Sequence, residues 1–199
     1  MVGAHGQDER RPYSIACSPE RASEIDAIEL LIALESGGDL GSNLSGAARG
    51  RLVDIEGPMG AFTFPATTGL PWLLFVAGGS GIAPLRAMLD HALRLHRSPK
   101  ISFLYSARRG DEFAFIDELR QHAANGRIEL HQTVTRDESG AWEGRRGRIG
   151  RSHFEAVVHA PAATLCFVCG PGALVQESVS TLGELGVPGA QIRTERWSG

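Results

Sequence analysis

Two glycine-rich stretches stand where an apolar run gives way to a helical pattern. The first follows residues 72–77 and reads Gly-Gly-Ser-Gly-Ile-Ala-Pro over 78–84; the second reads Cys-Gly-Pro-Gly over 169–172. Glycine lets a backbone approach a phosphate closely, and the start of a helix offers unpaired N–H groups to an anion. Both stretches therefore indicate nucleotide binding, although each alone is equally compatible with a tight turn between a strand and a helix.

A second kind of chemistry is indicated by the run Arg11, Pro12, Tyr13 and Ser14. It offers a cation for a phosphate, an aromatic ring for a flat cofactor and a hydroxyl hydrogen-bond donor. On a strand, Arg11 and Tyr13 would share one face. An ordinary exposed strand with a surface Arg–Tyr pair is the alternative, and for these four residues taken alone it is the favoured interpretation.

The three cysteines, Cys17, Cys166 and Cys169, are too few for a disulfide scaffold, and their odd number suits a reducing compartment. Cys166 and Cys169 form a Cys-x-x-Cys, a pattern also seen in zinc sites and redox dithiols. Here it lies in an apolar, strand-like run, where residues three apart point to opposite faces, and zinc needs more ligands than two. The seven histidines show no ligand spacing. We therefore predict no metal site and no plant-type [2Fe–2S] module, which needs four cysteines.

Length and charge exclude several classes of protein. The 199 residues, 42% of them hydrophobic, fit one large or two small domains. The net charge of −3 gives no global basic field for nucleic acid or an anionic membrane. The longest apolar run, 72–77, is far shorter than the roughly 20 residues of a membrane-spanning helix, and the polar first residues do not resemble a signal peptide. We expect a soluble, cytoplasmic protein.

Two patterns of secondary structure meet near residues 65–71. Before them, short strand-like runs at 11–16, 28–34 and 52–56 are separated by turn residues, with a short helical turn at 40–48 as the one exception. After them, strands and helices alternate, which predicts an α/β domain with a five-stranded parallel sheet and helices on both faces. The predicted strands are 72–77, 101–106, 128–135, 164–169 and 191–197, and 136–148 is expected to be an exposed loop. Ligands on such sheets bind at the carboxyl ends of the strands, where both glycine-rich stretches fall.

Taken in order, the motifs resemble those of the ferredoxin–NADP reductase family, flavoproteins that pass a hydride between a nicotinamide and a flavin. The resemblance runs from about residue 6 to 197 and rests on five strings: Arg-Pro-Tyr-Ser (11–14), Gly-Pro-Met-Gly-Ala-Phe (57–62), the stretch 78–84, Phe-Val-Cys-Gly-Pro-Gly (167–172) and Glu-Arg-Trp (195–197). It implies FAD, with FMN as the alternative, and NAD(P)H as cofactors. It also implies an acceptor such as a ferredoxin, another iron–sulfur protein, a haem protein, an oxygenase or a small molecule.

The resemblance implies which residues touch the flavin. Ser14 would lie near flavin N5 and Tyr13 against the ring, while Trp197 would cover the face that nicotinamide must reach. The full set is Arg11, Pro12, Tyr13, Ser14, Gly38, Leu40, Gly41, Ser42 and Trp197. Gly41 stands where many family members have serine, so backbone amides would have to hold the pyrophosphate there.

On the nicotinamide side, the resemblance places Cys169 beside the carbon that carries the hydride, and makes Ser14, Cys169 and Glu195 the catalytic residues. The NAD(P) set is Gly78, Gly79, Ser80, Gly81, Pro84, Ser106, Arg108, Arg109, Cys169, Gly170 and Pro171. Ser106, Arg108 or Arg109 would bind a 2′-phosphate, because guanidinium matches phosphate geometry. That favours NADPH, although the same arginines also fit solvated charges at a helix start.

The sequence departs from the family at its beginning. Family flavin domains are six-stranded barrels with the Arg-x-Tyr-Ser string on the fourth strand, and only ten residues precede it here. We therefore expect a partial antiparallel β-barrel over 1–68 ahead of the NAD(P)-binding domain over 69–199. Such a half-barrel leaves an open edge that a homo-oligomer would cover. A flavin-dependent oxidoreductase is the favoured function; the alternative is a non-catalytic nucleotide-binding module with a vestigial flavin site.

Overall fold

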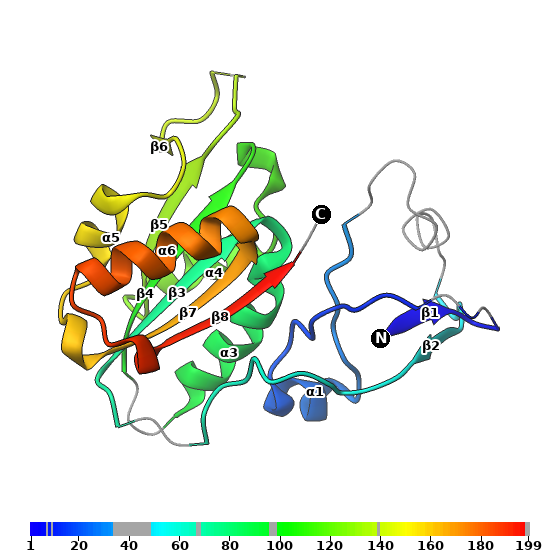
Figure 1. Ribbon diagram of the computed structural model, residues 1–199. Helices are drawn as coiled ribbons and strands as arrows, with labels where there is room; N and C mark the ends of the chain where they lie inside the picture. The colour runs from blue at the N-terminus through cyan, green and yellow to red at the C-terminus, as the bar shows by residue number, and fades with distance from the viewer. Residues whose placement is uncertain are drawn as a thin grey trace.

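The computed structural model describes residues 1–6, 8, 10–33, 49–66, 69–95, 99–138 and 140–197. Within them a six-stranded parallel sheet forms the larger part of the molecule (Figure 1), in the order β6-β5-β4-β3-β7-β8. Its strands are β3 (Trp72–Gly78), β4 (Lys100–Ala107), β5 (Glu129–Val134), β6 (Arg145–Arg146), β7 (Thr164–Pro171) and β8 (Ile192–Trp197). The five predicted strands are confirmed. The two residues of β6 add a sixth inside the segment that was expected to be only a loop.

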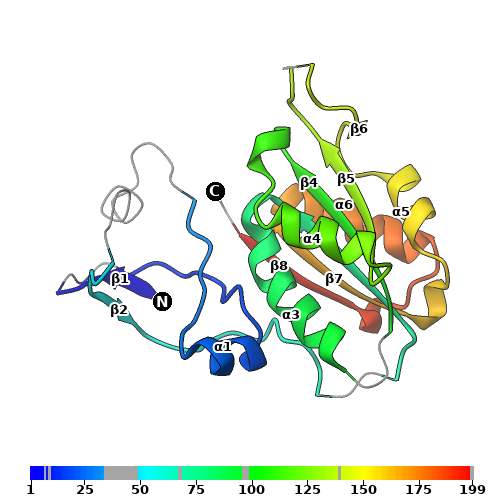
Figure 2. The same ribbon diagram turned by 180° about the vertical axis from the view of Figure 1, so that it is seen from behind.

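Helices cover both faces of this sheet (Figures 1 and 2). On one side lie α3 (Ile82–Arg94) and α4 (Ile116–Ala124), and on the other α5 (Arg151–Val157) and α6 (Gly172–Glu184). Single 3₁₀ turns join the elements at η1 (Gly79–Gly81), η2 (Gly110–Glu112), η3 (Pro161–Ala163) and η4 (Gly189–Gln191). None of the helices that the structure describes is long and apolar enough to pass through a bilayer.

The sheet is apolar on both faces because helices cover both of them. Successive residues of β3 alternate: Leu73 and Phe75 pack under α3 and α4, while Leu74 and Val76 pack under α5 and α6. Phe75 anchors the first face, with its ring centroid 5.5 Å from that of Phe167 on β7. This core makes the sheet rigid, and it holds the carboxyl ends of the central strands at one edge.

The N-terminal part is smaller and less regular. Its strands β1 (Val2–Ala4) and β2 (Val53–Ile55) pair antiparallel, so the strand expected at 52–56 is confirmed. The regular strands expected at 11–16 and 28–34 are wrong: within 10–33 each run makes one isolated bridge, Val2 to Arg11 and Ile15 to Leu30. The helical turn expected at 40–48 lies outside the described part of the chain.

One helix, α1 (Pro19–Ile25), was not predicted from the sequence and lies between those two runs. Ser18 caps it by accepting a hydrogen bond from the Arg21 backbone N–H, and Pro19 takes the first helical position. Its last turn ends at Asp26 in the left-handed conformation, with φ 51°. With seven residues and no buried side chain, α1 has no apolar period to detect, but the Ser-Pro-Glu start was a readable signal.

The segment after β2 crosses onto the larger part through aromatic contacts. The ring centroids of Phe62 and Phe64 lie 6.0 and 5.6 Å from that of Phe167 on β7. On the other side of this contact, α1 packs against α3 (Figures 1 and 2). The two parts therefore meet at α3, β7 and the segment around Phe62.

Gly81 lies too close to β7 to tolerate a side chain. A Cβ atom built there would lie 2.3 Å from the Cys169 carbonyl oxygen, and that backbone is held by strands on both sides. We predict that Gly81→Ala lowers the free energy of unfolding by about 1–3 kcal/mol, measured by urea denaturation. The matched control is Gly183→Ala in α6, where a Cβ meets nothing within 4 Å, and a gain of about 0.5–1 kcal/mol is expected. Equal stability of the two variants would contradict this packing.

Candidate functional site

Three neighbouring strands bring the predicted site residues to one edge of the sheet. In the register of the sheet, Ala77 of β3 pairs with Cys169 of β7, and Cys169 pairs with Glu195 of β8. Gly78 and Gly79 follow directly after Ala77. Because parallel strands end on the same side, the first glycine turn, the cysteine and the carboxylate become neighbours although the chain separates them widely.

Glu195 joins the two parts of the molecule. Its Oε2 accepts a hydrogen bond from the Ser14 hydroxyl at 3.4 Å and a weaker one from the Cys169 thiol at 3.8 Å. Ser14 comes from the N-terminal part and Cys169 from the sheet. The three residues predicted to be catalytic therefore meet around a single carboxylate oxygen.

The two cysteines of the Cys-x-x-Cys point to opposite faces of β7. Cys169 packs on the α3 side and Cys166 on the α6 side, and both thiols are free. Burial raises the pKa of each thiol to about 12, and the negative charge of Glu195 adds to the effect at Cys169. Cys169 is therefore a protonated donor to Glu195 and not a thiolate nucleophile.

A residue outside the predicted set supports the first glycine turn through a hydrogen bond. Tyr105, fully buried on β4, donates its hydroxyl to the Gly79 carbonyl oxygen at 3.2 Å. Burial raises the pKa of this phenol, so it stays a donor. A tyrosine in an otherwise apolar strand needs a partner for its hydroxyl, which was the available signal. Gly79 itself takes φ +54°, a conformation that favours glycine.

The two glycine-rich turns lie against each other, backbone to backbone. A Cβ at Gly78 would meet the side chains of Leu174 at 2.5 Å and Pro171 at 2.9 Å, and one at Gly170 would lie 3.1 Å from the Gly78 Cα. Beside Gly172, at the first residue of α6, there is open space. Neither α3 nor α6 has an acidic residue in its first turn. The start of α6, which has no side-chain cap and no competing carboxylate, fits a phosphate of a dinucleotide.

Further along the same edge, the residues predicted to bind a 2′-phosphate lie at the end of β4, where Ser106 is in the strand and the two arginines follow it. Ser106 is nearly buried, with 9% of its surface exposed, and Arg108 is exposed. Arg109 is held in a salt bridge to Asp111, with 2.6 Å between Nη2 and Oδ2. Of the two arginines predicted for this role, Arg108 is thus the one without a carboxylate partner among the described residues.

The flavin-side residues are only partly within the described structure. Tyr13 is half-buried against the small cluster of Val2 and Ala4, whereas Arg11 and Pro12 are exposed. Trp197 keeps 37% of its surface exposed, and its ring lies 3.8 Å from a Cβ built on Gly79. An exposed indole, a half-buried phenol and the Ser14 hydroxyl suit a flat aromatic cofactor. The predicted pyrophosphate residues Gly38, Leu40, Gly41 and Ser42 lie outside the described residues.

No arrangement of three or more His, Cys, Asp or Glu side chains able to hold a metal ion occurs in the part of the chain that the structure describes.

Family models match both parts of the chain. Residues 1–64 match the oxidoreductase FAD-binding domain, and residues 75–179 match the oxidoreductase NAD-binding domain. Ferredoxin–NADP reductase B of Sorangium cellulosum (strain So ce56) is 32% identical over 202 residues, which cover 96% of this chain and 80% of that protein. The chain belongs to the ferredoxin–NADP reductase family.

Other proteins similar to this chain differ more in length. One component of the Na(+)-translocating NADH-quinone reductase of Neisseria gonorrhoeae is 29% identical over 95% of this chain, which spans 49% of that protein. Among solved structures, the ferredoxin reductase in carbazole 1,9a-dioxygenase superposes with a TM-score of 0.84 at 24% identity, covering 99% of this chain and 58% of its own. The Amycolatopsis cytochrome P450 reductase GcoB superposes with a TM-score of 0.82 at 23% identity, and the match covers 100% of this chain and 59% of that one. These two structures show the same fold.

Membership of the ferredoxin–NADP reductase family makes the chain an oxidoreductase with FAD and NAD(P)H as cofactors. The glycine turns on β3 and β7 lie within the matched NAD-binding domain, and Ser14 lies within the matched FAD-binding domain. The Ser14–Glu195–Cys169 contact therefore joins the two cofactor-binding parts.

The burial of all three cysteines predicts low thiol reactivity in the folded protein. At pH 8 a thiol with a pKa of about 12 is ionised to about one part in ten thousand. Ellman's reagent should react only slowly with the native chain, and with all three thiols after unfolding in guanidinium. Glu195→Gln, which removes the neighbouring charge but not the burial, should leave the native reaction slow. A rapidly reacting thiol in the native chain would contradict the burial of Cys169.

Proposed function

We propose that this chain oxidises NAD(P)H and passes the electrons through FAD to a separate acceptor. The observation that carries the proposal is the shared carboxylate: Glu195 contacts Ser14, the residue expected beside the flavin, and Cys169, the residue expected beside the nicotinamide. A site that must bring two flat rings into contact needs such a junction between its two halves. Alignment of the reactants supplies most of the rate in reactions of this type.

Each side chain has a role that follows from its contacts. When bound, FAD supplies the acceptor for the hydride of NAD(P)H and the means of releasing electrons one or two at a time. The backbone N–H groups of the glycine turn 78–81 and of the start of α6 bind the phosphates of the dinucleotide. Ser14 and Cys169 both donate to Glu195, which holds the two side chains in place between the two parts. Trp197 occupies the place beside Gly79 that the nicotinamide would take, so it must move aside for the reaction.

We propose a division into a flavin part over 1–68 and an NAD(P) part over 69–199. The acceptor class is a ferredoxin, another iron–sulfur protein or an oxygenase, because the Sorangium cellulosum relative is named a ferredoxin–NADP reductase. A cytoplasmic location stays a prediction, and it agrees with three free cysteines.

One observation favours a second candidate function. On and beside β2, the apolar side chains of Leu52, Ile55 and Met59 are 66%, 53% and 65% exposed. A flavin part with exposed apolar side chains such as these needs a cover, for which a second copy of the chain is the simplest source. If nothing covers it, the chain is a nucleotide-binding module whose flavin half does not retain the cofactor.

The two functions are separated by adding FAD to the purified chain. We expect a bound flavin with its yellow absorption band, which NAD(P)H bleaches in the absence of oxygen. Glu195→Gln should still bind FAD but should be reduced at least about tenfold more slowly, because the common acceptor of Ser14 and Cys169 loses its charge and gains a competing NH₂ donor. Calorimetry that detects NADPH binding without FAD binding would favour the nucleotide-binding module, and binding of neither would contradict both functions.

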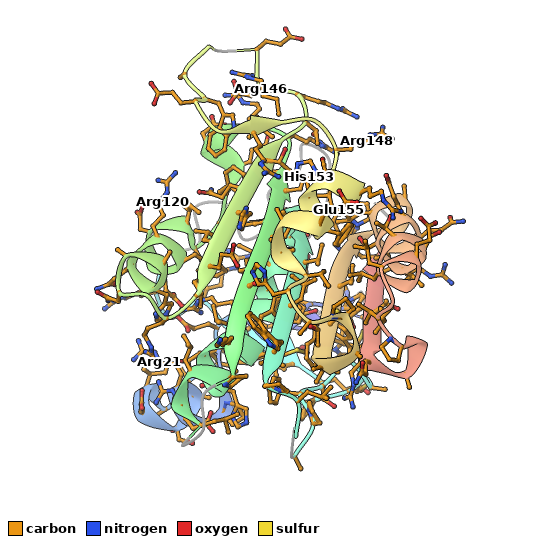
Figure 3. The ribbon with its side chains drawn as sticks, turned by 90° about the vertical axis from the view of Figure 1, so that its left-hand side faces the viewer. Arg21, Arg120, Arg146, Arg148, His153 and Glu155 are labelled. Carbon is orange, nitrogen blue, oxygen red and sulfur yellow. The ribbon has the colours of Figure 1, made fainter. Side chains whose placement is uncertain are left out.

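Coenzyme choice follows from the arginines after β4. We predict that Arg108→Ala raises the KM for NADPH at least about tenfold, because a charge-assisted contact to a phosphate is lost, with a much smaller change for NADH. Steady-state kinetics with both coenzymes measures this. The control for the loss of one positive charge is Arg120→Ala. Arg120 lies on α4, well away from Arg146 and Arg148 at the β6 edge (Figure 3). An equal rise of both KM values would contradict a 2′-phosphate site at Arg108.

A further inference from the structure

Arg86 connects more segments than a helix residue normally does. It lies on α3, two residues after Pro84, with 12% of its side chain exposed. Its Nη1 donates to the Ala16 carbonyl oxygen at 2.7 Å and to Glu29 Oε2 at 2.9 Å. Its Nε and Nη2 both reach Glu118 Oε2 at 2.8 Å. The guanidinium carbon also lies 4.4 Å from the centre of the Phe115 ring.

These contacts tie the N-terminal part to the sheet domain at one point. Ala16 and Glu29 belong to the N-terminal part, whereas Glu118 and Phe115 belong to α4 and the residue before it. The Ala16 N–H donates to the Glu29 carbonyl oxygen at 2.8 Å, so the two segments that Arg86 binds are also hydrogen-bonded to each other. Ala16 is only two residues after Ser14. The guanidinium therefore holds the short segment that carries the Ser14 hydroxyl.

The same helix also contacts the nicotinamide side. Gly81, immediately before α3, lies so close to the Cys169 backbone that only a hydrogen fits between them. These contacts form a closed ring. Through side chains, Cys169 contacts Glu195 and Glu195 contacts Ser14. The chain runs from Ser14 to Ala16, whose carbonyl binds Arg86, and α3 leads from Arg86 back to Gly81 beside Cys169. If Arg86 loosens, the link from Ala16 to α3 opens. The Ser18–Asp90 hydrogen bond still attaches the chain two residues further on, and Ser14 keeps its long hydrogen bond to Glu195.

Charge and shape both require arginine at this position. Two carboxylates and a carbonyl oxygen converge on one largely buried cation, so removing it takes the charged partner from both carboxylates and a hydrogen bond from the carbonyl. Lysine keeps the charge but is a point donor on a flexible stem, and it lacks the flat fork that reaches three acceptors while stacking on Phe115. An Arg86→Lys exchange therefore separates geometry from charge.

The other ion pairs at this junction hold a different element. Glu20 pairs with His91 and Glu24 with Arg94, and Ser18 donates to Asp90; all of these attach α1 to α3. The two ion pairs among them are more exposed than Arg86, with 35% of the Arg94 side chain accessible. These hydrogen bonds and ion pairs do not include Ala16 or Ser14. Arg94 is thus a control on the same helix with the same kind of partners.

We propose that Arg86 is a positioning residue, which fixes Ser14 against Glu195 and Cys169 by holding the Ala16 carbonyl. This inference rests on the proposed function for its effect on the reaction. Its effect on the Ser14 segment is independent of that function and is tested separately.

The first experiment uses hydrogen–deuterium exchange of the whole chain without cofactors. Arg86→Lys should raise exchange at the Ala16 amide by about tenfold or more, because its hydrogen bond to Glu29 opens with the segment. Exchange in the β3 and β4 amides should stay unchanged. Arg94→Lys should raise exchange in α1 and leave Ala16 as in the unsubstituted chain. Unchanged exchange at Ala16 in Arg86→Lys would overturn the proposal.

The second experiment measures flavin reduction by stopped flow at saturating NADPH. For Arg86→Lys, FAD and NADPH affinities should stay within about threefold, while the reduction rate constant falls by about 10- to 100-fold, as a misplacement of about 1 Å predicts. Arg94→Lys should change the rate by less than about twofold. Equal losses in both variants, or a loss of affinity instead of rate, would overturn the positioning role.

Two outcomes keep this inference distinct from the proposed function. If the unsubstituted chain is not reduced by NAD(P)H, the proposed function fails, while the exchange at Ala16 still decides whether Arg86 holds the segment. If Arg86→Lys does not fold, Glu118→Gln replaces it, since this change removes one anchor of the guanidinium and keeps the arginine. Exchange at Ala16 should then rise by about threefold or more, and no rise would overturn the proposal.

Discussion

Pairing of β7 with β3 on one side and β8 on the other is the constraint on which the site depends. It aligns Ala77, Cys169 and Glu195 across three strands, with the glycine turns directly beyond them. The strands are held in this register by a core packed on both faces, with Phe75 against Phe167 on the α3 side. Because parallel strands are buried on both faces, a slip in register would expose apolar side chains and separate the three residues.

Helix α3 contacts both the aligned strands and the N-terminal part, and so joins the two parts of the molecule. Its first turn lies against the Cys169 backbone, and its next turns carry Arg86, Asp90, His91 and Arg94 toward the N-terminal part. The helix therefore follows the glycine turn at one end and presents a row of charged side chains to another segment along its side. Most of these pairs are partly exposed and contribute little each, whereas Arg86 is buried and holds several acceptors at once.

Much of this could be predicted from local sequence. The runs that form β3 and β7 are apolar and end in glycine, and the strings around Ser14, Cys169 and Glu195 are short and contiguous. Features made by distant partners gave no local signal: these are the two residues of β6 and the bridges that replace two expected strands. Helix α1 is different, because Ser18 and Pro19 do mark its start. Its seven residues have no buried face, so they show no helical period of apolar residues.

The state of Cys169 shows what kind of chemistry the site supports. A thiol with a pKa of about 12 beside a carboxylate gains nothing as a nucleophile, because both burial and the negative charge oppose its ionisation. The same surroundings suit a small, weakly polar side chain that fills space and donates to Glu195. Ser14 donates to the same oxygen from the opposite part. A carboxylate between two neutral donors orients them without making a covalent bond, and orientation is what transfer between two bound cofactors requires.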